Sequence, residues 1–132
     1  MNQEILSLLN QWVPEAKAVG SFINGEWIEG HGEAITVFKA HDNTVLYQYN
    51  DADVAMIPTL NACTAKAQAE WIALTGAQRG RMMFEIGRLI RENAEQLALL
   101  ESKSSNKPIR DARGEVAKVA EMFEYYAGWT DK

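Results

Sequence analysis

Residues 108–132 decide the fold, and they read Pro-Ile-Arg-Asp-Ala-Arg-Gly-Glu-Val-Ala-Lys-Val-Ala-Glu-Met-Phe-Glu-Tyr-Tyr-Ala-Gly-Trp-Thr-Asp-Lys. Apolar side chains recur at steps of three and four, which predicts an amphipathic helix from about Pro108 to Trp129. Gly114 stands inside this helix, where glycine costs about 1 kcal/mol relative to alanine unless a close approach needs it. The predicted buried stripe consists of Ile109, Ala112, Val116, Val119, Ala120, Phe123 and Ala127.

Two further helices are expected immediately upstream. The stretch Thr75-Gly76-Ala77-Gln78 has the form of a capping box, which opens a helix. Asn93-Ala94-Glu95-Gln96 repeats that pattern, and the break at Asn106-Lys107-Pro108 separates the second of these helices from the last one. The buried stripe expected on the first consists of Met82, Met83, Ile86, Leu89 and Ile90, and the second carries Leu97, Leu99 and Leu100.

An earlier helix is expected between residues 51 and 71. Asp51 is a suitable N-cap, but Pro58 falls within the pattern. Proline removes a backbone hydrogen bond and clashes with the preceding turn. The helix therefore either kinks at Pro58 or begins near Ile57, with proline in its first turn.

The segment before residue 51 has the pattern of β-ribbons. Asn24-Gly25 is a favoured type I′ turn pair between Phe22-Ile23 and Trp27-Ile28. Residues 34–40 and 44–49 predict a second strand pair around His41-Asp42-Asn43. Residues 3–13 predict a short amphipathic helix, which is either a local packing piece or an arm that docks on a partner. The expected fold class is α+β and mainly helical, with two β-ribbons followed by about four helices.

Length and composition bound the class of protein. The 132 residues fit one unit, divided into residues 1–20 (helix and linker), 21–50 (ribbons) and 51–132 (helices). The net charge of −5, without a basic stripe, argues against nucleic-acid binding. The sequence has no membrane-spanning run and no signal peptide at its start. The single cysteine, Cys63, fits a reducing compartment, so we expect a cytoplasmic protein.

The residues alone show no catalytic constellation. There is no phosphate-binding glycine motif, and His31 and His41 have no zinc-ligand spacing with Cys63. No serine stands in a nucleophile elbow. The carboxylates Glu115, Glu121 and Glu124 share the last helix and are interpreted as its solvated face.

Five segments, in order and in register, resemble the NAD(P)-dependent aldehyde dehydrogenase family. Phe22–Trp27 is similar to the family's "(F/Y)INGEW" hairpin, and Ala65–Trp71 to its "A…A…A…W" helix end. Leu74–Met83 resembles "L…ER…LL", and residues 99–116 resemble "LES…GKP…AR…EV". Residues 123–132 are very close to "FRYYAGWADK" and are the most specific. The resemblance covers residues 21–132.

The resemblance implies that this chain is the N-terminal part of the cofactor-binding domain of the α/β aldehyde dehydrogenase fold. The family oxidises aldehydes to carboxylates with NAD or NADP, using a cysteine nucleophile, a glutamate base and an oxyanion-hole asparagine. All three belong to segments beyond residue 132. We therefore expect no catalytic residue and no cofactor-binding residue in this sequence, and no bound cofactor for this chain alone.

Two family sites do reach this segment. The last helix lines the substrate entrance of the family, which places Gly114 and Lys118 at tunnel-facing positions; Lys118 is either an attractor of acidic or polar aldehydes or a solvated lysine. The family's structural alkali-cation site falls near Val37 and Ser104. Ser104 replaces the usual aspartate, and the loss of a carboxylate weakens a site made of hard oxygen ligands.

Two hypotheses remain open from the sequence. The first is a fragment of an aldehyde dehydrogenase that is inactive by itself. The second is a stand-alone binding or assembly module from the same segment, whose apolar faces and strand edges are covered by self-association, including domain swapping. Neither hypothesis includes a nucleic-acid or membrane partner.

Overall fold

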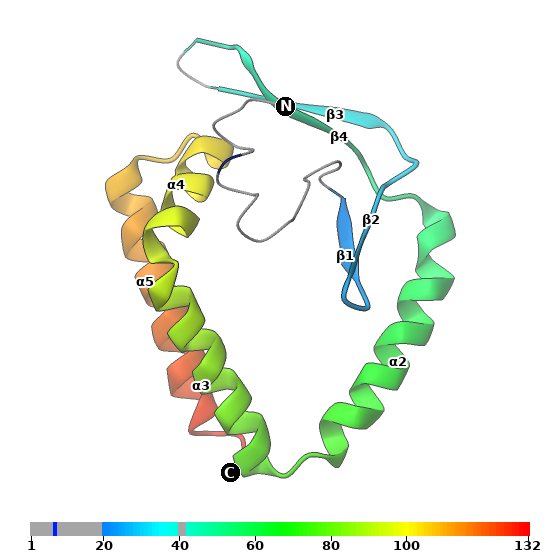
Figure 1. The fold of residues 1–132 in the computed structure, drawn as a ribbon, viewed down its shortest axis with the longest axis vertical. Coiled ribbons are helices and arrows are strands. Elements are labelled where there is room, and N and C mark those ends of the chain that lie inside the picture. The colour runs from blue at the N-terminus through cyan, green and yellow to red at the C-terminus, as the bar shows by residue number, and fades with distance from the viewer. Residues whose placement is uncertain (1–6, 8–19, 40–41) are drawn as a thin grey trace. The chain divides into compact units, whose positions relative to one another are not determined.

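The computed structural model describes Ser7, residues 20–39 and residues 42–132. In chain order these ranges contain four strands, a short 3-10 helix and four longer helices (Figure 1). The strands are β1 (Ser21–Ile23), β2 (Glu26–Ile28), β3 (Ala34–Phe38) and β4 (Val45–Asn50), and the helices are η1 (Val54–Met56), α2 (Ile57–Ala73), α3 (Gly76–Glu92), α4 (Ala94–Ser105) and α5 (Ile109–Ala127). The expected class, two ribbons followed by four helices, is confirmed. Apart from Ser7, the helix expected over residues 3–13 lies outside the described residues, as does the turn residue His41.

The chain divides into two compact units, Met1–Ala67 and Gln68–Lys132. The boundary falls inside α2. The expectation that the whole chain belongs to one cofactor-binding domain stays a prediction. Within the described residues, no helix is both long and apolar enough to cross a membrane.

The first hairpin has the turn that its sequence predicts. Asn24 and Gly25 have φ angles of 53° and 83°, in the left-handed region that a type I′ turn requires. Strands β1 and β2 pair antiparallel, with Phe22 opposite Trp27 and their ring centroids 5.2 Å apart. Close cross-strand aromatic pairs of this kind stabilise short ribbons.

The second ribbon pairs β3 with β4 in antiparallel register, with an irregularity between Val37 and Phe38. Its loop is closed by Asp42, whose carboxylate accepts hydrogen bonds from the Thr44 amide (3.0 Å) and hydroxyl (2.7 Å). Leu46 on β4 is fully buried. The ribbon therefore has a buried anchor although it consists of only two strands.

The start of the helical region differs from the Asp51 cap expected from sequence. The N-cap of the short helix η1 is Asp53, whose carboxylate accepts from the Ala55 amide at 2.7 Å. The Asp51 carboxylate accepts from the adjacent Ala52 amide at 2.8 Å and caps no helix. Helix α2 then begins at Ile57, so Pro58 lies in its first turn. Of the two alternatives for Pro58, the one without a kink is confirmed, because proline in a first turn removes no intrahelical bond.

Helix α3 begins at the predicted capping box. The Thr75 hydroxyl accepts from the Gln78 amide at 3.3 Å, and the Gln78 side chain accepts from the Thr75 amide at 2.8 Å. The second predicted box, at Asn93, does not form. The Asn93 side chain makes no capping hydrogen bond at the start of α4, and its Nδ2 instead donates to the Leu89 carbonyl at 2.8 Å.

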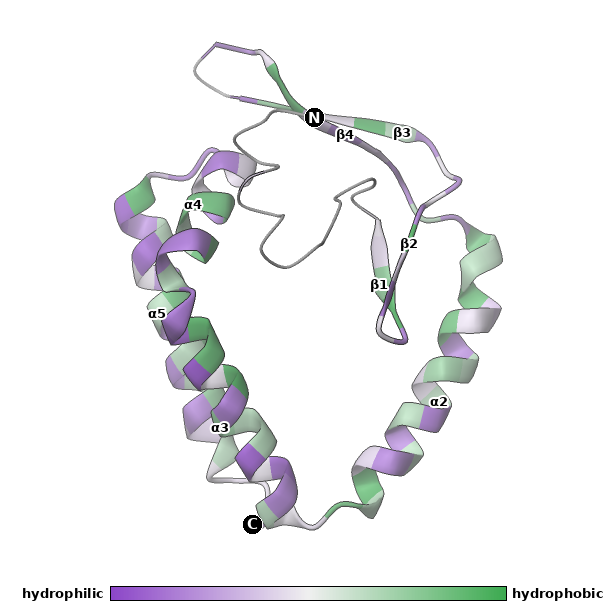
Figure 2. Cartoon of the chain, in the orientation of Figure 1, coloured by the Kyte–Doolittle hydropathy of each residue, from purple (hydrophilic) through white to green (hydrophobic). Residues whose placement is uncertain are grey.

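Helices α3 and α5 pack through small residues rather than through the predicted large ones. The buried residues of α3 are Gly80 and Gly87, and those of α5 are Ala112, Ala120 and Ala127. The stripe predicted to be buried on α3 was wrong, since Met82, Ile86 and Leu89 are 39–49% exposed. On α5 the alanines were right, but Val119 is 44% exposed. Figure 2 shows hydrophobic and hydrophilic residues interleaved along both helices.

Candidate functional site

Helix α5 holds both residues predicted to face the substrate entrance. Gly114 and Lys118 are four residues apart, so they lie on one face of the helix. A Cβ at Gly114 would meet nothing within 4 Å, so the surface beside it is open. The structure therefore places the two residues together on an exposed face, as their helical spacing requires.

The charge of Lys118 is available at the surface. Its side chain is 70% exposed, and its ammonium nitrogen lies 2.9 Å from Glu121 Oε2, one turn along the helix. The Lys118 bond lowers the pKa of Glu121, so this carboxylate stays ionised. An exposed pair of this kind is weak and exchanges readily for another partner.

A hollow of about 530 Å³ lies beside Lys118 on the same helix. Tyr125 contributes to its lining and stacks edge-to-face on Tyr126, with ring centroids 5.1 Å apart. The complete lining is Lys118, Glu121, Met122, Glu124, Tyr125 and Tyr126. The hollow thus combines aromatic walls with one cationic and two anionic side chains, which suits a small molecule that has apolar and polar parts.

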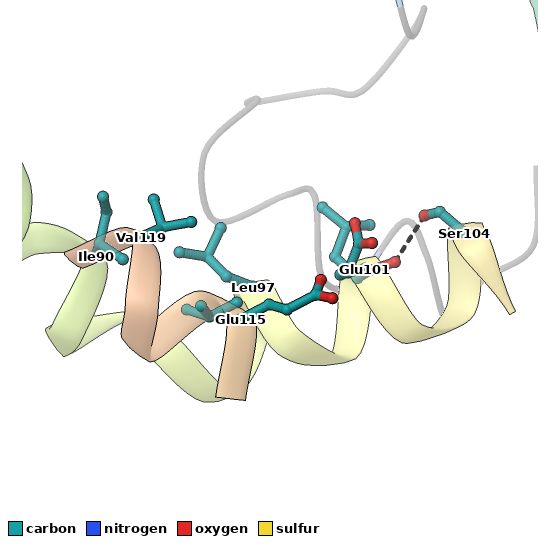
Figure 3. Close-up of a pocket in the computed structure, with 8 residues that line it drawn as sticks. Ile90, Leu97, Glu101, Ser104, Glu115 and Val119 are labelled. Atoms are coloured by element: carbon teal, nitrogen blue, oxygen red, sulfur yellow. Dashed lines mark hydrogen bonds between the residues drawn. The ribbon is translucent and has the colours of Figure 1, made fainter. Parts of the chain in front are cut away.

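A second hollow, of about 520 Å³, lies where α3, α4 and α5 meet (Figure 3). Its floor is apolar, and Figure 3 shows Ile90 and Val119 close together at one end, with the Glu101 and Ser104 side chains toward the other. The lining residues are Ile90, Leu97, Leu100, Glu101, Ser104, Glu115, Val116 and Val119.

The polar end of this second hollow is a network of charges. Lys107 Nζ binds Glu115 and also Glu101, the latter at 2.9 Å, and these bonds raise the pKa of Lys107. The same Lys107 bond lowers the pKa of Glu101, with a smaller contribution from Ser105. The carboxylate therefore stays ionised and bound to a cation, so it is poorly suited to accept a proton as a catalytic base.

The proposed cation positions lie on different elements. Val37 is on β3 and Ser104 is on α4, which belong to different compact units, so their pairing in one site stays a prediction. The Ser104 hydroxyl donates to the Leu100 carbonyl at 2.7 Å, and its oxygen keeps its acceptor capacity. Among the described residues, no group of three or more His, Cys, Asp or Glu side chains is placed to hold a metal ion.

The other candidates from the sequence have ordinary surroundings. His31 is exposed beside a small hollow that Asp53 also lines, and Cys63 is half-buried on α2. The carboxylates of α5 are more than a solvated face, because Glu115 binds Lys107 and Glu124 binds Arg91 of α3. The contact between Arg91 of α3 and Glu124 of α5 has no signal in the sequence, since it joins residues 33 positions apart.

Comparison with known proteins identifies relatives of this chain. The sequence model described as the aldehyde dehydrogenase family matches residues 27–132. Betaine aldehyde dehydrogenase of Bacillus subtilis is 31% identical over 121 residues, which cover 84% of this chain and 23% of that protein.

Solved structures show the same similarity. An aldehyde dehydrogenase of Brucella melitensis biovar abortus 2308 superposes with a TM-score of 0.81 at 30% identity, covering 91% of this chain and 25% of that one. PnpE, solved in complex with nicotinamide adenine dinucleotide, has a TM-score of 0.79 at 33% identity, covering 85% of this chain and 23% of its own. The chain thus spans about a quarter of the length of the relatives that it matches.

Proposed function

The chain belongs to the aldehyde dehydrogenase family, and we propose that it forms the N-terminal part of an NAD(P)-dependent enzyme that oxidises an aldehyde to a carboxylate. The observation that carries this proposal is the continuous match over residues 27–132. Similarity to PnpE, whose structure contains nicotinamide adenine dinucleotide, supports a nicotinamide cofactor for the complete enzyme.

This segment contributes to substrate access rather than to the chemical step. The family's cysteine nucleophile, glutamate base and oxyanion-hole asparagine correspond to no residue of this sequence. The 132-residue polypeptide by itself is therefore expected neither to bind NAD(P) nor to oxidise aldehydes. Its single cysteine supports a reducing compartment, the cytoplasm.

Gly114 and Lys118 are proposed to line the entrance for the aldehyde. The open surface at Gly114 leaves room for a substrate to pass. The ammonium group of Lys118 attracts aldehydes that carry a carboxylate or another polar group, because its bond to Glu121 is exposed and weak. Val37 and Ser104 are proposed to contribute to the structural alkali-cation site of the complete enzyme.

The test uses a chimera and the chain alone. Residues 27–132 replace the matching segment of the Bacillus subtilis betaine aldehyde dehydrogenase, and aldehyde-dependent reduction of NAD is followed by absorbance. The soluble chimera is expected to be active and the 132-residue chain to be inactive. Aldehyde-dependent NADH formation by the purified chain alone would contradict its proposed dependence on further segments. A soluble chimera that binds NAD but does not turn over would contradict the proposed role of the segment.

A second candidate function is self-association, and one observation favours it. Large apolar side chains on α3 and α5 stay exposed while the contacts between the helices use glycine and alanine. Exposed apolar surface of this kind is typical of interaction sites. The partner in this case is a second copy of the chain, which includes the possibility of domain swapping.

A further inference from the structure

A pair of crossing hydrogen bonds joins the beginning of α3 to the turn that follows α5. The Arg79 guanidinium donates to the Leu74 carbonyl at 2.5 Å and to the Thr130 carbonyl at 3.2 Å. The Thr130 hydroxyl lies 2.8 Å from the Gly76 carbonyl and 3.0 Å from that of Ala127. We propose that Arg79 is a positioning residue whose guanidinium fixes the end of α5, and with it the helix that carries Gly114 and Lys118. This inference rests on the proposed function for the role of those two residues.

The glycines of α3 show how closely the two backbones approach at this point. A Cβ at Gly76 would lie 2.7 Å from the Thr130 carbonyl oxygen, and one at Gly80 would lie 2.8 Å from that of Ala127. Both neighbours are main-chain atoms, which a side-chain rotation cannot move away. The clasp formed by Arg79 and Thr130 therefore closes a contact between backbones, where a small displacement cannot be absorbed by side chains.

Arginine suits this position because its donors are arranged in a fixed fork. The guanidinium reaches two carbonyls at the same time, whereas the single ammonium nitrogen of lysine is a compact charge without that planar geometry. Charged donors also make stronger hydrogen bonds than neutral ones. The two carbonyls belong to residues 74 and 130, so one side chain links two segments that are distant in sequence.

The other contacts that hold α5 are of a different kind. Arg91 binds Glu124 and Arg113 binds Glu95, but these side chains are 32–55% exposed. Exposed ion pairs contribute little and are screened by salt. Arg79 is half-buried and binds backbone, so it defines the axial and rotational position of α5 most strictly. A slip of α5 by one residue would turn Lys118 by about 100° around the helix axis.

The test measures the position of α5 in the full 132-residue chain. Spin labels at positions 81 and 118, in a Cys63→Ser background, report the distance between α3 and α5. Amide hydrogen exchange at Gly128, Trp129 and Lys132, which donate within the last turns, reports the clasp directly. Arg79→Lys removes the fork that reaches two carbonyls, Thr130→Val removes the hydroxyl and leaves the Thr130 carbonyl, and Thr130→Ser retains the hydroxyl. Arg88→Lys is the matched control, because Arg88 pairs with Glu85 and Glu92 of its own helix α3.

We expect Arg79→Lys and Thr130→Val to broaden or shift the distribution of distances between the two spin labels. Hydrogen exchange at the three amides should become about tenfold faster, because the lost hydrogen bonds allow the turn after α5 to open locally. Thr130→Ser and Arg88→Lys should leave both readouts unchanged. An unchanged distance distribution in Arg79→Lys would overturn the proposal, whatever the result for Thr130→Val, because the proposal assigns the position of α5 to the Arg79 guanidinium. So would global unfolding of both variants, since the clasp would then determine the fold and not the position of α5. The chimera assay tests the proposed function separately, so the two can fail independently.

Discussion

The Arg91 guanidinium on α3 donates to both carboxylate oxygens of Glu124 on α5, at 2.6 and 2.8 Å. This bidentate geometry joins residues that are 33 positions apart and lowers the pKa of Glu124. Glu95 makes the same kind of contact with Arg113, which lowers the pKa of Glu95 as well. Two bidentate ion pairs therefore join α5 to α3 and α4, and the exposure of their side chains keeps the contribution of each pair small.

The first prediction is that the chain loses stability in acid. Glu95 and Glu124 have folded pKa values below their ordinary value of 4.5, so their contribution is complete above that value and is lost as the pH falls through the lowered folded pKa. In urea unfolding followed by circular dichroism, the midpoint concentration of urea should stay constant from about pH 8 to about pH 6. The midpoint should then decrease at pH values below the range in which carboxylates ordinarily titrate. Glu124→Gln should flatten this fall, and Glu26→Gln on β2 is the control. An acid profile that Glu124→Gln leaves unchanged would count against the contribution of the pair.

The second prediction contrasts two glycines within helices. Gly80→Ala should destabilise the chain by about 1–3 kcal/mol, because the new Cβ overlaps backbone and the helix-propensity gain of about 1 kcal/mol does not offset this. Gly114→Ala should stabilise it by up to about 1 kcal/mol, because a Cβ there meets nothing within 4 Å. Chemical denaturation of the two variants measures both values. Equal effects of the two substitutions would mean that the backbones approach less closely at Gly80.

The third prediction concerns the capping box of α3. Thr75→Ala removes the oxygen that accepts from the Gln78 amide and should cost about 1 kcal/mol. Thr75→Ser keeps that oxygen and should cost distinctly less. Denaturation midpoints of the two variants provide the measurement, and an equal loss in both would show that the methyl group matters more than the cap.

Sequence patterns predicted those elements whose signals are local. The Asn24-Gly25 turn, the Thr75 capping box and the break before α5 each depend on neighbouring residues, and all three are present. Local reasoning failed at Asn93, where the side chain bonds back to Leu89 instead of capping the helix. The choice between these two bonds depends on how α3 ends, which a capping pattern does not contain.

Patterns over longer distances were less informative. Apolar periodicity predicted which face of α3 is apolar but not that Gly80 and Gly87 form the contact with α5, since close approach of two backbones depends on both helices together. Arg79 lay within the matched segment "L…ER…LL", yet its bonds to Leu74 and Thr130 follow only from the three-dimensional arrangement. The resemblance identified the family, and the structure added the contacts that hold α5.

The fourth prediction tests self-association through the exposed apolar stripe of α3. Met82, Ile86 and Leu89 follow helical spacing and lie on one face, whereas Phe84 lies two positions away from both Met82 and Ile86 and faces elsewhere. Leu89→Lys should reduce any concentration-dependent association seen by sedimentation velocity. Phe84→Lys, with similar exposure, is the matched control and should have no effect. A monomeric wild-type chain over the whole concentration range would exclude the module hypothesis in this form.

The last prediction concerns Lys118 as a determinant of substrate choice in the active chimera. Lys118→Met should raise the KM for an aldehyde that carries a carboxylate by about fivefold, as expected for one exposed charge interaction, and should leave kcat unchanged. The KM for an uncharged aldehyde of the same length should stay the same. Glu121→Gln should act in the opposite direction, because it releases the ammonium group from its bond at 2.9 Å. Arg81→Met, which removes an exposed cation from α3, controls for net charge. If Lys118→Met and Arg81→Met raise the KM equally, the effect belongs to the overall field of the protein and Lys118 does not line the entrance.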